Sequence, residues 1–326
     1  MSETVSAWSG PKSPFTGAPP RRPGQLRRTL SMDMLRPDGL EGDLVLRGLG
    51  RDVLTGAGGE PVLLSSAELH VTATSDRTVF RATSTPQLTG LGELEGARLG
   101  PGFRALAARA LGEEQEGTLL AQLVDDLPVT ALISGFAHGR KQLLAGVPRP
   151  RASLLRIGTC AAWAPGSAPA RRAVVGERAL YPDVVSAAPP EAGPDPDAWH
   201  PMPPLPPLAM RRRRRIDVMP GTPAIVDAYF RDVVVEPDGS EAVLHEYTVR
   251  CEVDQESGVV SAMQATPFVL PYADCLGAVP SPALLDGVTL AELRATARQR
   301  LDGVVGCTHL MDAVRSMADV AHLLRY

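Results

Sequence analysis

The sequence predicts an α+β protein made of two tandem repeats, each an antiparallel sheet of about three to four strands followed by two helices packed on one face. Two observations lead to this prediction. In each half of the chain, segments with strand-like alternation of apolar and polar residues precede segments with helical spacing. Residues also recur in the same order: Val260 to Pro267 aligns with Val79 to Pro86, and Leu285-Asp286-Gly287 aligns with Leu94-Glu95-Gly96.

The repeats and their surroundings divide the 326 residues into four segments. Residues 1–24 are rich in Ser, Pro, Gly and Arg and lack the apolar stretch of a signal peptide, so we expect a disordered leader. Residues 25–145 form the first repeat, which we interpret as degenerate and structural. Residues 146–210 form a Pro-rich linker, in which the run Ala187 to Pro207 must be largely extended. Residues 211–326 form the second repeat, which holds the candidate site.

In the first repeat, strand patterns come before helix patterns. Pro37-Asp38-Gly39 is a turn signal between the first two strand candidates, and Ser75-Asp76-Arg77 separates the third from the fourth. The second helical segment contains Pro128, which can break a helix. The expected strands are residues 27–33, 40–53, 63–74 and 78–85, and the expected helices are residues 103–110 and 119–136.

The linker carries Trp199 and His200 inside its Pro-rich run. They could anchor the linker to a domain surface or fold over a pocket, and we expect anchoring, because a buried ring supplies a large apolar contact. The run Arg211 to Arg215 follows. A basic run can bind polyanions, but we interpret this one as a solvated charge run with structural salt bridges.

The strand expected at residues 241–253 alternates cleanly in polarity. Val243, His245 and Cys251 fall on one face with other apolar residues, whereas Glu246 falls on the opposite face. For Cys251 the simplest interpretation is a buried thiol. For His245, taken alone, it is a core histidine that bonds a backbone carbonyl.

Two helices are predicted at the C-terminal end, joined at Gly306-Cys307-Thr308-His309-Leu310. Thr289 to Glu292 has the form of a capping box, and the helix that it begins should end near Gly303. Thr308 is the N-cap candidate of the last helix. Cys307 would then lie just outside a helix N-terminus, where the helix dipole favours thiolate over thiol. The alternative is that Cys307 is a small apolar residue at a tight turn.

The two repeats differ in their polar groups. Cys307 and His309 fall opposite Gly117 and Leu119 of the first repeat, whereas the helical stripes and turn residues persist in both. We therefore expect any functional site to lie in the second repeat.

Three side chains of the second repeat form a sensible ligand set for a soft metal ion. His245 lies on a strand, Cys275 ends an extended segment, and Cys307 precedes a helix. One imidazole and two thiolates suit zinc or iron, and Glu246, His309 or water would complete a tetrahedral site. We therefore predict a zinc or iron site and no other cofactor.

Two other functions remain open. A small-molecule enzyme of the lyase or hydrolase type could use the same cleft, with Cys307 or a metal-bound water as the reactive group and His245 or His309 as the proton shuttle. Cys307 and His309 are then the catalytic candidates. A non-catalytic interaction protein whose cysteines are core residues is the third possibility. The sequence does not decide whether the protein is an enzyme, because it contains no phosphate-binding loop, HExxH or GxSxG motif.

Residues of the second repeat also resemble a known family. Arg214-Arg215, Leu244-His245-Glu246 and Gly306-Cys307-Thr308-His309-Leu310 look like the bacterial family called domain of unknown function 2889, here in tandem with a degenerate first copy. The family name implies no activity.

A more distant resemblance is to iron–sulfur scaffold proteins of the NifU/IscU type, which bind zinc or a cluster through three cysteines and an aspartate. It rests on a strand, a turn and a strand, followed by one Cys and by a second Cys that opens the last helix. The resemblance places Cys275 and Cys307 on the second and third cysteines and His245 on the aspartate. Val243 falls on the first cysteine and cannot ligate, so the resemblance implies a single metal or a thiol site.

Composition excludes several classes of protein. A net charge of -4 and an aromatic content of 4% argue against a nucleic-acid partner. No apolar run reaches the roughly 18 residues that a membrane helix needs. Four cysteines at irregular spacing do not make a disulfide framework and fit a reducing compartment, so we expect a cytoplasmic protein. The expected partners are a small molecule or a metal ion, and the oligomeric state is left open.

Overall fold

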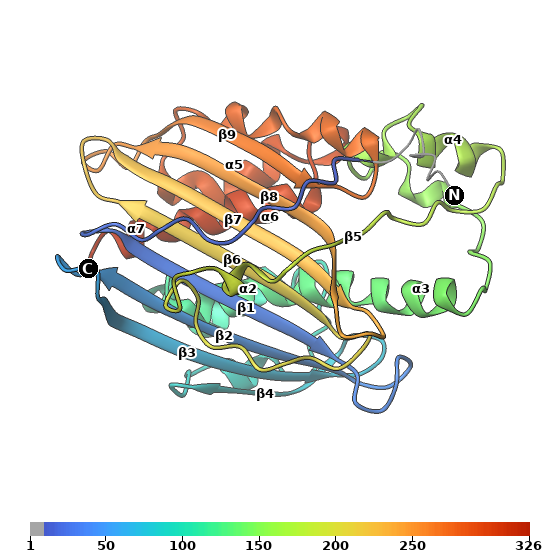
Figure 1. The fold of residues 1–326 in the computed structure, drawn as a ribbon, viewed down its shortest axis with the longest axis horizontal. Coiled ribbons are helices and arrows are strands. Elements are labelled where there is room, and N and C mark those ends of the chain that lie inside the picture. The colour runs from blue at the N-terminus through green and yellow to red at the C-terminus, as the bar shows by residue number, and fades with distance from the viewer. Residues whose placement is uncertain (1–9) are drawn as a thin grey trace.

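One antiparallel sheet of nine strands runs through residues 10–326, the part of the chain that this computed structural model describes (Figure 1). The strand order is β4-β3-β2-β1-β6-β7-β8-β5, and β9 also pairs with β8. The α+β class is therefore confirmed. The strands are β1 Leu26–Leu35, β2 Leu44–Thr55, β3 Pro61–Ala73, β4 Val79–Thr85, β5 Val185–Ser186, β6 Met210–Met219, β7 Ala224–Val235, β8 Glu241–Val253 and β9 Val260–Val269.

The sheet is continuous because β1 pairs with β6, from Leu26 opposite Val218 to Met34 opposite Met210. The prediction of two separate sheets of three to four strands is corrected by this pairing. We define the N-terminal half as β1–β4 with the helices that follow them, and the C-terminal half as β6–β9 with theirs. Strand lengths agree between the halves: β1 and β6 have 10 residues, β2 and β7 have 12, and β3 and β8 have 13.

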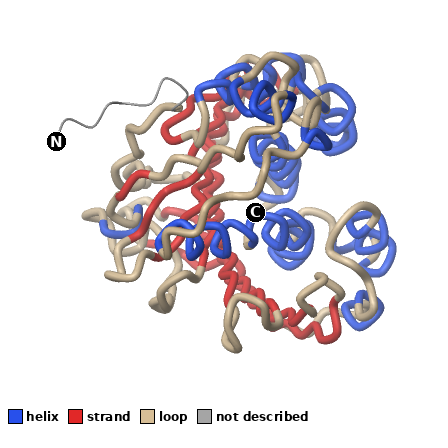
Figure 2. The backbone as a smooth tube through the Cα atoms, turned by 90° about the vertical axis from the view of Figure 1, so that its right-hand side faces the viewer, coloured by secondary structure: helices blue, strands red, loops and turns tan. Residues whose placement is uncertain are grey.

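Helices cover one face of the sheet, and irregular segments cover the other (Figure 2). The helices are α1 Phe103–Leu111, α2 Leu119–Ile133, α3 Gly135–Leu144, α4 Ala168–Val174, α5 Leu290–Arg300, α6 Thr308–Ser316 and α7 Val320–Leu323. Apolar side chains between sheet and helices form two cores, one mainly in each half. The predicted capping box is present, because Thr289 accepts from the backbone of Glu292 at the start of α5.

One helical stretch, Leu119–Leu144, is long and apolar enough to span a membrane by length and composition. It consists of α2 and α3, and α2 continues through Pro128. Of its apolar window, 67% is buried inside the protein, as expected for a helix of the folded core. This stretch corrects the expectation that no apolar run reaches the length of a membrane helix.

The five arginines at the start of β6 are buried, which corrects the expectation of a solvated charge run. Alternation along the strand sends Arg212 and Arg214 toward the helices and the other three toward the irregular layer. Each is paired with acidic groups, most of them from other segments of the chain, which a buried charge requires. The pairs are Arg211 with Asp33, Arg212 with Asp232 and Asp312, Arg213 with Glu191 and Glu241, Arg214 with Asp126 and Asp312, and Arg215 with Asp217 and Asp227.

The linker is anchored on the face opposite the helices, as expected. Trp199 packs edge-on against Tyr229 of β7, with ring centroids 6.0 Å apart. The His200 imidazole is hydrogen-bonded to the hydroxyls of Ser31 and Thr29 of β1, at 2.8 and 2.9 Å. In Figure 1 the linker and the first described residues both cross this face.

Part of the predicted disordered leader also lies on this face. Lys12 forms a β-bridge with Val269, and the Phe15 ring contacts Tyr229 and Phe268. Residues 10–24 are therefore an ordered strap, whereas residues 1–9 of the predicted leader lie outside the described part of the chain.

Candidate metal centre

Asp232, His245 and His309 converge at one point on the helix-facing side of the C-terminal half. One ligand atom from each of them lies within 4.8 Å of the other two, and no other such group of His, Cys, Asp or Glu occurs in residues 10–326. Asp232 is on β7, His245 is directly opposite it on β8, and His309 is in the first turn of α6. The cluster therefore joins two neighbouring strands to the helix that crosses them.

A β-bulge brings His245 to this point. Asp232 pairs with His245, but the next residue, Val233, pairs with Val243, which leaves Leu244 as an extra residue on β8. Leu244 and His245 both line one cavity, while Val243 packs with Val233 on the other side of the sheet. The prediction that Val243 shares a face with His245 is therefore wrong, because the bulge interrupts the alternation.

The two imidazole rings are stacked, with centroids 3.7 Å apart and an angle of 28° between their planes. The Nδ1 atoms of His245 and His309 lie 3.3 and 3.7 Å from Oδ2 of Asp232. His245 Nδ1 is buried and faces the Asp232 carboxylate, whereas His309 Nδ1 also lies 3.2 Å from Nη2 of Arg212. A neutral imidazole nitrogen and a carboxylate oxygen that face each other need a proton or a cation between them, and a bound metal ion is one way of satisfying both.

Arg212 fixes the carboxylate of the cluster. Its Nε and Nη2 donate to the two oxygens of Asp232 at 2.7 and 2.9 Å. Burial alone would raise the pKa of Asp232, but the charge of Arg212 and the hydrogen bonds of His245 and Arg212 outweigh it and hold that pKa below its usual range. Burial and the neighbouring His245 lower the pKa of His309 well below 6.5. An ionised carboxylate and a neutral imidazole are the protonation states that metal ligation needs.

A cavity of about 570 Å³ opens on the cluster. His245 and His309 line it, together with residues from the α2–α3 junction and from residues 149–182 of the linker. The linker is therefore part of the candidate site. Its composition gave no sign of this role.

Cys275 and Cys307 line the same cavity, but neither sulfur belongs to the close group of ligand atoms. The predicted set of His245, Cys275 and Cys307 is thus brought to one cavity without being brought within metal-binding distance.

Neither thiol is activated. Burial raises the pKa of Cys275 well above its ordinary value, and burial raises the pKa of Cys307 to about 11. Cys307, not Thr308, is the N-cap residue of α6, and its side chain makes no capping hydrogen bond. The expected thiolate at the helix N-terminus is corrected accordingly, because desolvation outweighs the favourable backbone N–H groups.

Glu246, the predicted fourth ligand, lies on the opposite face of β8. Its carboxylate is fully buried and accepts hydrogen bonds from Tyr229, Arg231 and the backbone N–H of Phe15. It holds the strap and the linker face together and is not available to His245. Cys251 is a buried core thiol, in agreement with its simplest interpretation.

Sequence reasoning missed Asp232 and Arg212, which frame the cluster. Asp232 lies inside its strand, between Arg231 and the apolar run Val233 to Val235, and Arg212 was counted only as one member of a charge run. The useful signal was a charged residue inside an otherwise buried strand pattern, which calls for a partner on the neighbouring strand.

These features define an α+β protein with one continuous sheet and a buried His/His/Asp cluster at the wall of a cavity. Residues 210–323, which include the whole cluster, match the model of a family described as "Protein of unknown function (DUF2889)". The match supports the family assignment for this segment. Neither the curated proteins nor the solved structures contain a match to the chain.

Proposed function

We propose that the C-terminal half binds a divalent zinc or iron ion through Asp232, His245 and His309. Two imidazoles and one carboxylate are the protein ligands of many catalytic zinc sites and of non-haem iron sites, in which the remaining positions stay open to water or substrate. The proposal replaces the thiolates of the predicted ligand set with Asp232 and His309 and keeps the predicted metals.

The observation that carries the proposal is the convergence of the three ligand atoms, with the buried Nδ1 of His245 facing Oδ2 of Asp232 at 3.3 Å. Arg212 donates one hydrogen bond to each oxygen of Asp232. A carboxylate oxygen can accept more than one contact, so Oδ2 can face a cation while Arg212 fixes its orientation.

A second candidate function is catalysis on a small organic molecule in the adjoining cavity. The specific observation in its favour is that His245, His309 and Cys307 line this cavity, which is of a size that encloses a small molecule. A lyase or hydrolase step that uses a metal-bound water is the reaction type that such a site serves best.

The iron–sulfur scaffold role has weaker support. Such a role needs several thiolate ligands at one point, and neither Cys275 nor Cys307 belongs to the close group of ligand atoms. All four cysteines are free, which agrees with the proposed cytoplasmic location.

The metal proposal is tested by loading the purified protein with zinc, iron(II) or cobalt(II) and measuring bound metal after desalting. We expect about one metal per chain in the wild type and at least a tenfold lower affinity in His245→Ala and His309→Ala. The cobalt form should show no absorption from a sulfur–cobalt charge transfer.

The matched controls are Ser65→Ala and Leu119→Ala, at the corresponding positions of the N-terminal half, and Cys275→Ser and Cys307→Ser. None of the four should change metal content. Loss of metal in the serine variants with retention in the alanine variants at 245 and 309 would instead support the thiolate set. Absence of binding in the wild type would leave a non-catalytic protein with a buried histidine pair.

A further inference from the structure

We infer that the cavity beside the histidine pair binds a small organic carboxylate with an apolar body. This inference names the kind of molecule that the proposed metal site would act on, and its meaning as a substrate rests on that proposal. The binding of the anion itself rests on different residues.

The cavity has basic groups and no acidic side chain on its surface. Arg77, Arg140, Arg149 and Arg156 line it, and no Asp or Glu does so among the residues that the structure describes. Asp232 lies behind the histidines and is already paired with Arg212. A cavity with this charge attracts an anion and repels a cation.

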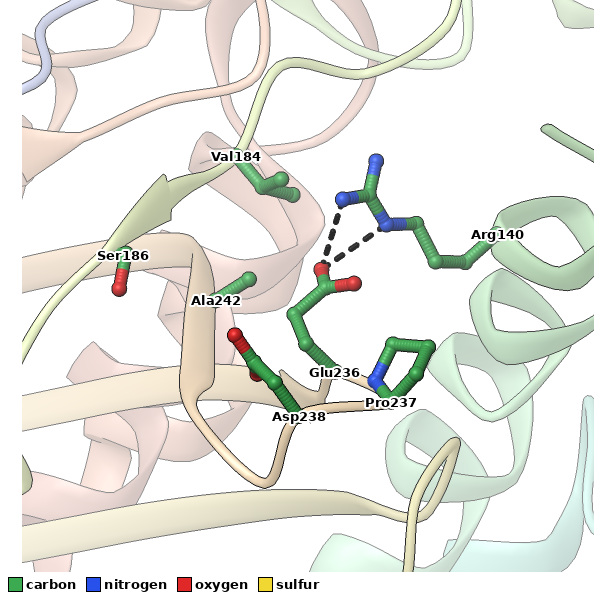
Figure 3. Close-up of a pocket in the computed structure, with 7 residues that line it drawn as sticks. All are labelled: Arg140, Val184, Ser186, Glu236, Pro237, Asp238 and Ala242. Carbon is green, nitrogen blue, oxygen red and sulfur yellow. Dashed lines mark hydrogen bonds and ion pairs between the residues drawn. The ribbon is translucent and has the colours of Figure 1, made fainter. Parts of the chain in front are cut away.

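Arg140 is the one of these four whose charge is matched. It forms an ion pair with Glu236, at 2.8 Å from Nη2, beside a separate depression that Val184 and Asp238 also line (Figure 3). Arg140 therefore connects the cavity wall to the end of β7 and is a poor candidate for the anion contact.

Arg149 and Arg156 are held by aromatic rings. The guanidinium of Arg149 lies 4.9 Å from the ring centroid of Tyr181, and that of Arg156 lies 5.6 Å from the ring of Trp163. Neither forms an ion pair with a carboxylate within residues 10–326. Arg149 also donates through Nη1 to the backbone oxygen of Leu180. Stacking on a ring orients a planar guanidinium, and the N–H groups that it leaves unbonded suit contact with a carboxylate.

The positive charges of both guanidinium groups oppose the effect of burial on the pKa of the same side chain in the cavity wall, Tyr272. Burial raises the pKa of Tyr272 to about 12, and Arg149 and Arg156 both act against this rise. Their positive charges therefore reach the part of the cavity where Tyr272 and Cys275 lie, the same cavity that His245 and His309 line.

The remaining wall is apolar. It consists mainly of Leu132, Ile133, Phe136, Leu143, Trp163 and Leu244. Walls of this kind bury a hydrocarbon or aromatic body, whereas a small hydrated anion such as phosphate would leave them uncovered. The combination favours a carboxylate on an apolar frame.

The test is calorimetric titration of the full chain with benzoate and with benzamide, its neutral analogue of the same shape. We expect benzoate to bind at least tenfold more tightly. We expect Arg149→Gln and Arg156→Gln each to weaken benzoate binding about tenfold or more, because a charge-assisted hydrogen bond is lost, while benzamide binding changes little. Arg298→Gln, on the exposed face of α5, removes the same charge elsewhere and should have no effect.

Equal affinities for the two probes, or unchanged benzoate binding in both glutamine variants, would overturn the inference. Unchanged benzamide binding shows that a variant is folded around an intact cavity. The titrations are repeated after metal removal and in His245→Ala. Benzoate binding that persists there shows that the anion contact does not depend on the metal. Benzoate binding by a wild type that takes up no metal refutes the metal proposal alone, whereas metal binding without benzoate binding refutes the carboxylate alone.

Discussion

The two halves of the sheet share one buried frame and differ in what surrounds it. In the N-terminal half Arg28 donates through Nε and Nη2 to Asp52, and its Nη1 reaches Gln122 of α2. In the C-terminal half Arg212 makes the same contacts with Asp232 and reaches Asp312 of α6. Both aspartates precede a bulge in the strand pair. A guanidinium that ties two strands to a helix is thus common to both halves.

Among residues 10–326, a histidine pair beside the aspartate of this frame occurs in the C-terminal half alone. Ser65 pairs with Asp52 where His245 pairs with Asp232, and Leu119 stands three residues before Gln122 where His309 stands three before Asp312. The Tyr326 hydroxyl, at 3.3 Å, is the additional group at Asp52. Since the frame forms without the histidines, we infer that they serve function rather than folding.

The seam between the halves repeats the same chemistry. Arg27 of β1 pairs with Asp217 of β6, and Arg211 of β6 pairs with Asp33 of β1. The two pairs lie near opposite ends of the β1–β6 ladder. Backbone hydrogen bonds and these crossed ion pairs together close the two halves into one sheet.

The largest expected effect comes from breaking the shared frame. Arg28→Ala and Arg212→Ala each leave a buried aspartate without its partner, so each should lower the free energy of unfolding by about 3–5 kcal/mol. The measurement is urea unfolding at pH 7. Similar losses would show that the pair is structural in both halves.

The control is Arg250→Ala. Arg250 pairs with Asp227, but its side chain is 73% exposed, so its removal should cost less than about 1 kcal/mol. If Arg212→Ala were as mild as this control while Arg28→Ala was severe, Arg212 would belong to the site rather than to the frame, and the comparison of the halves would fail.

Local patterns predicted much of this fold. The period-2 alternation placed β8 at residues 241–253, and the Thr289 capping box located the start of α5. These features depend on neighbouring residues, which sequence reasoning can see. The pairing of β1 with β6 depends on backbone groups and on Asp33 and Asp217, which carry no local signature of each other.

The candidate site shows the same limit. His245 and His309 were recognised, because their residue types are unusual in apolar patterns. Asp232 was missed, and Cys275 and Cys307 were overvalued. The extra residue Leu244 shifts the alternation of β8, so residues before and after it exchange faces of the sheet. The helix N-terminus favours a thiolate at Cys307, but burial of the side chain outweighs that effect. Bulges and desolvation are properties of the assembled protein.

The second-largest expected effect concerns the side-chain contacts on the face of each half opposite the helices. Thr29 and Ser31 of β1 bond to His200, whereas Arg213 and Arg215 of β6 bond to carboxylates. Burial and nearby arginines lower the pKa of His200 to about 3, compared with 6.5 for a free histidine. The unfolded chain therefore takes up a proton below pH 6.5 while the folded protein does not, and stability falls as the pH drops toward 3.

Between pH 7 and pH 5 this histidine alone should cost about 2 kcal/mol of stability. In urea unfolding at both pH values, His200→Gln should lose about 2 kcal/mol less stability than the wild type between pH 7 and pH 5. An identical pH dependence in the two proteins would mean that burial does not keep His200 neutral in the folded protein. The outer-face contacts of the two halves would then respond alike to acid.

The smallest effect distinguishes the two helices that cross the frame. The N-cap of α2 is Thr118, whose hydroxyl accepts from the backbone N–H of Ala121, whereas the N-cap of α6 is Cys307, which makes no such bond. Thr118→Ala should therefore cost about 1 kcal/mol, and Cys307→Ser should gain up to about 0.5–1 kcal/mol by adding a capping oxygen of similar size. Thermal and urea unfolding of both variants measure this. A loss of stability in Cys307→Ser would show that the packing of the thiol contributes more than the added capping bond. Packing of α6 against its neighbours, rather than its N-cap, would then stabilise the helix.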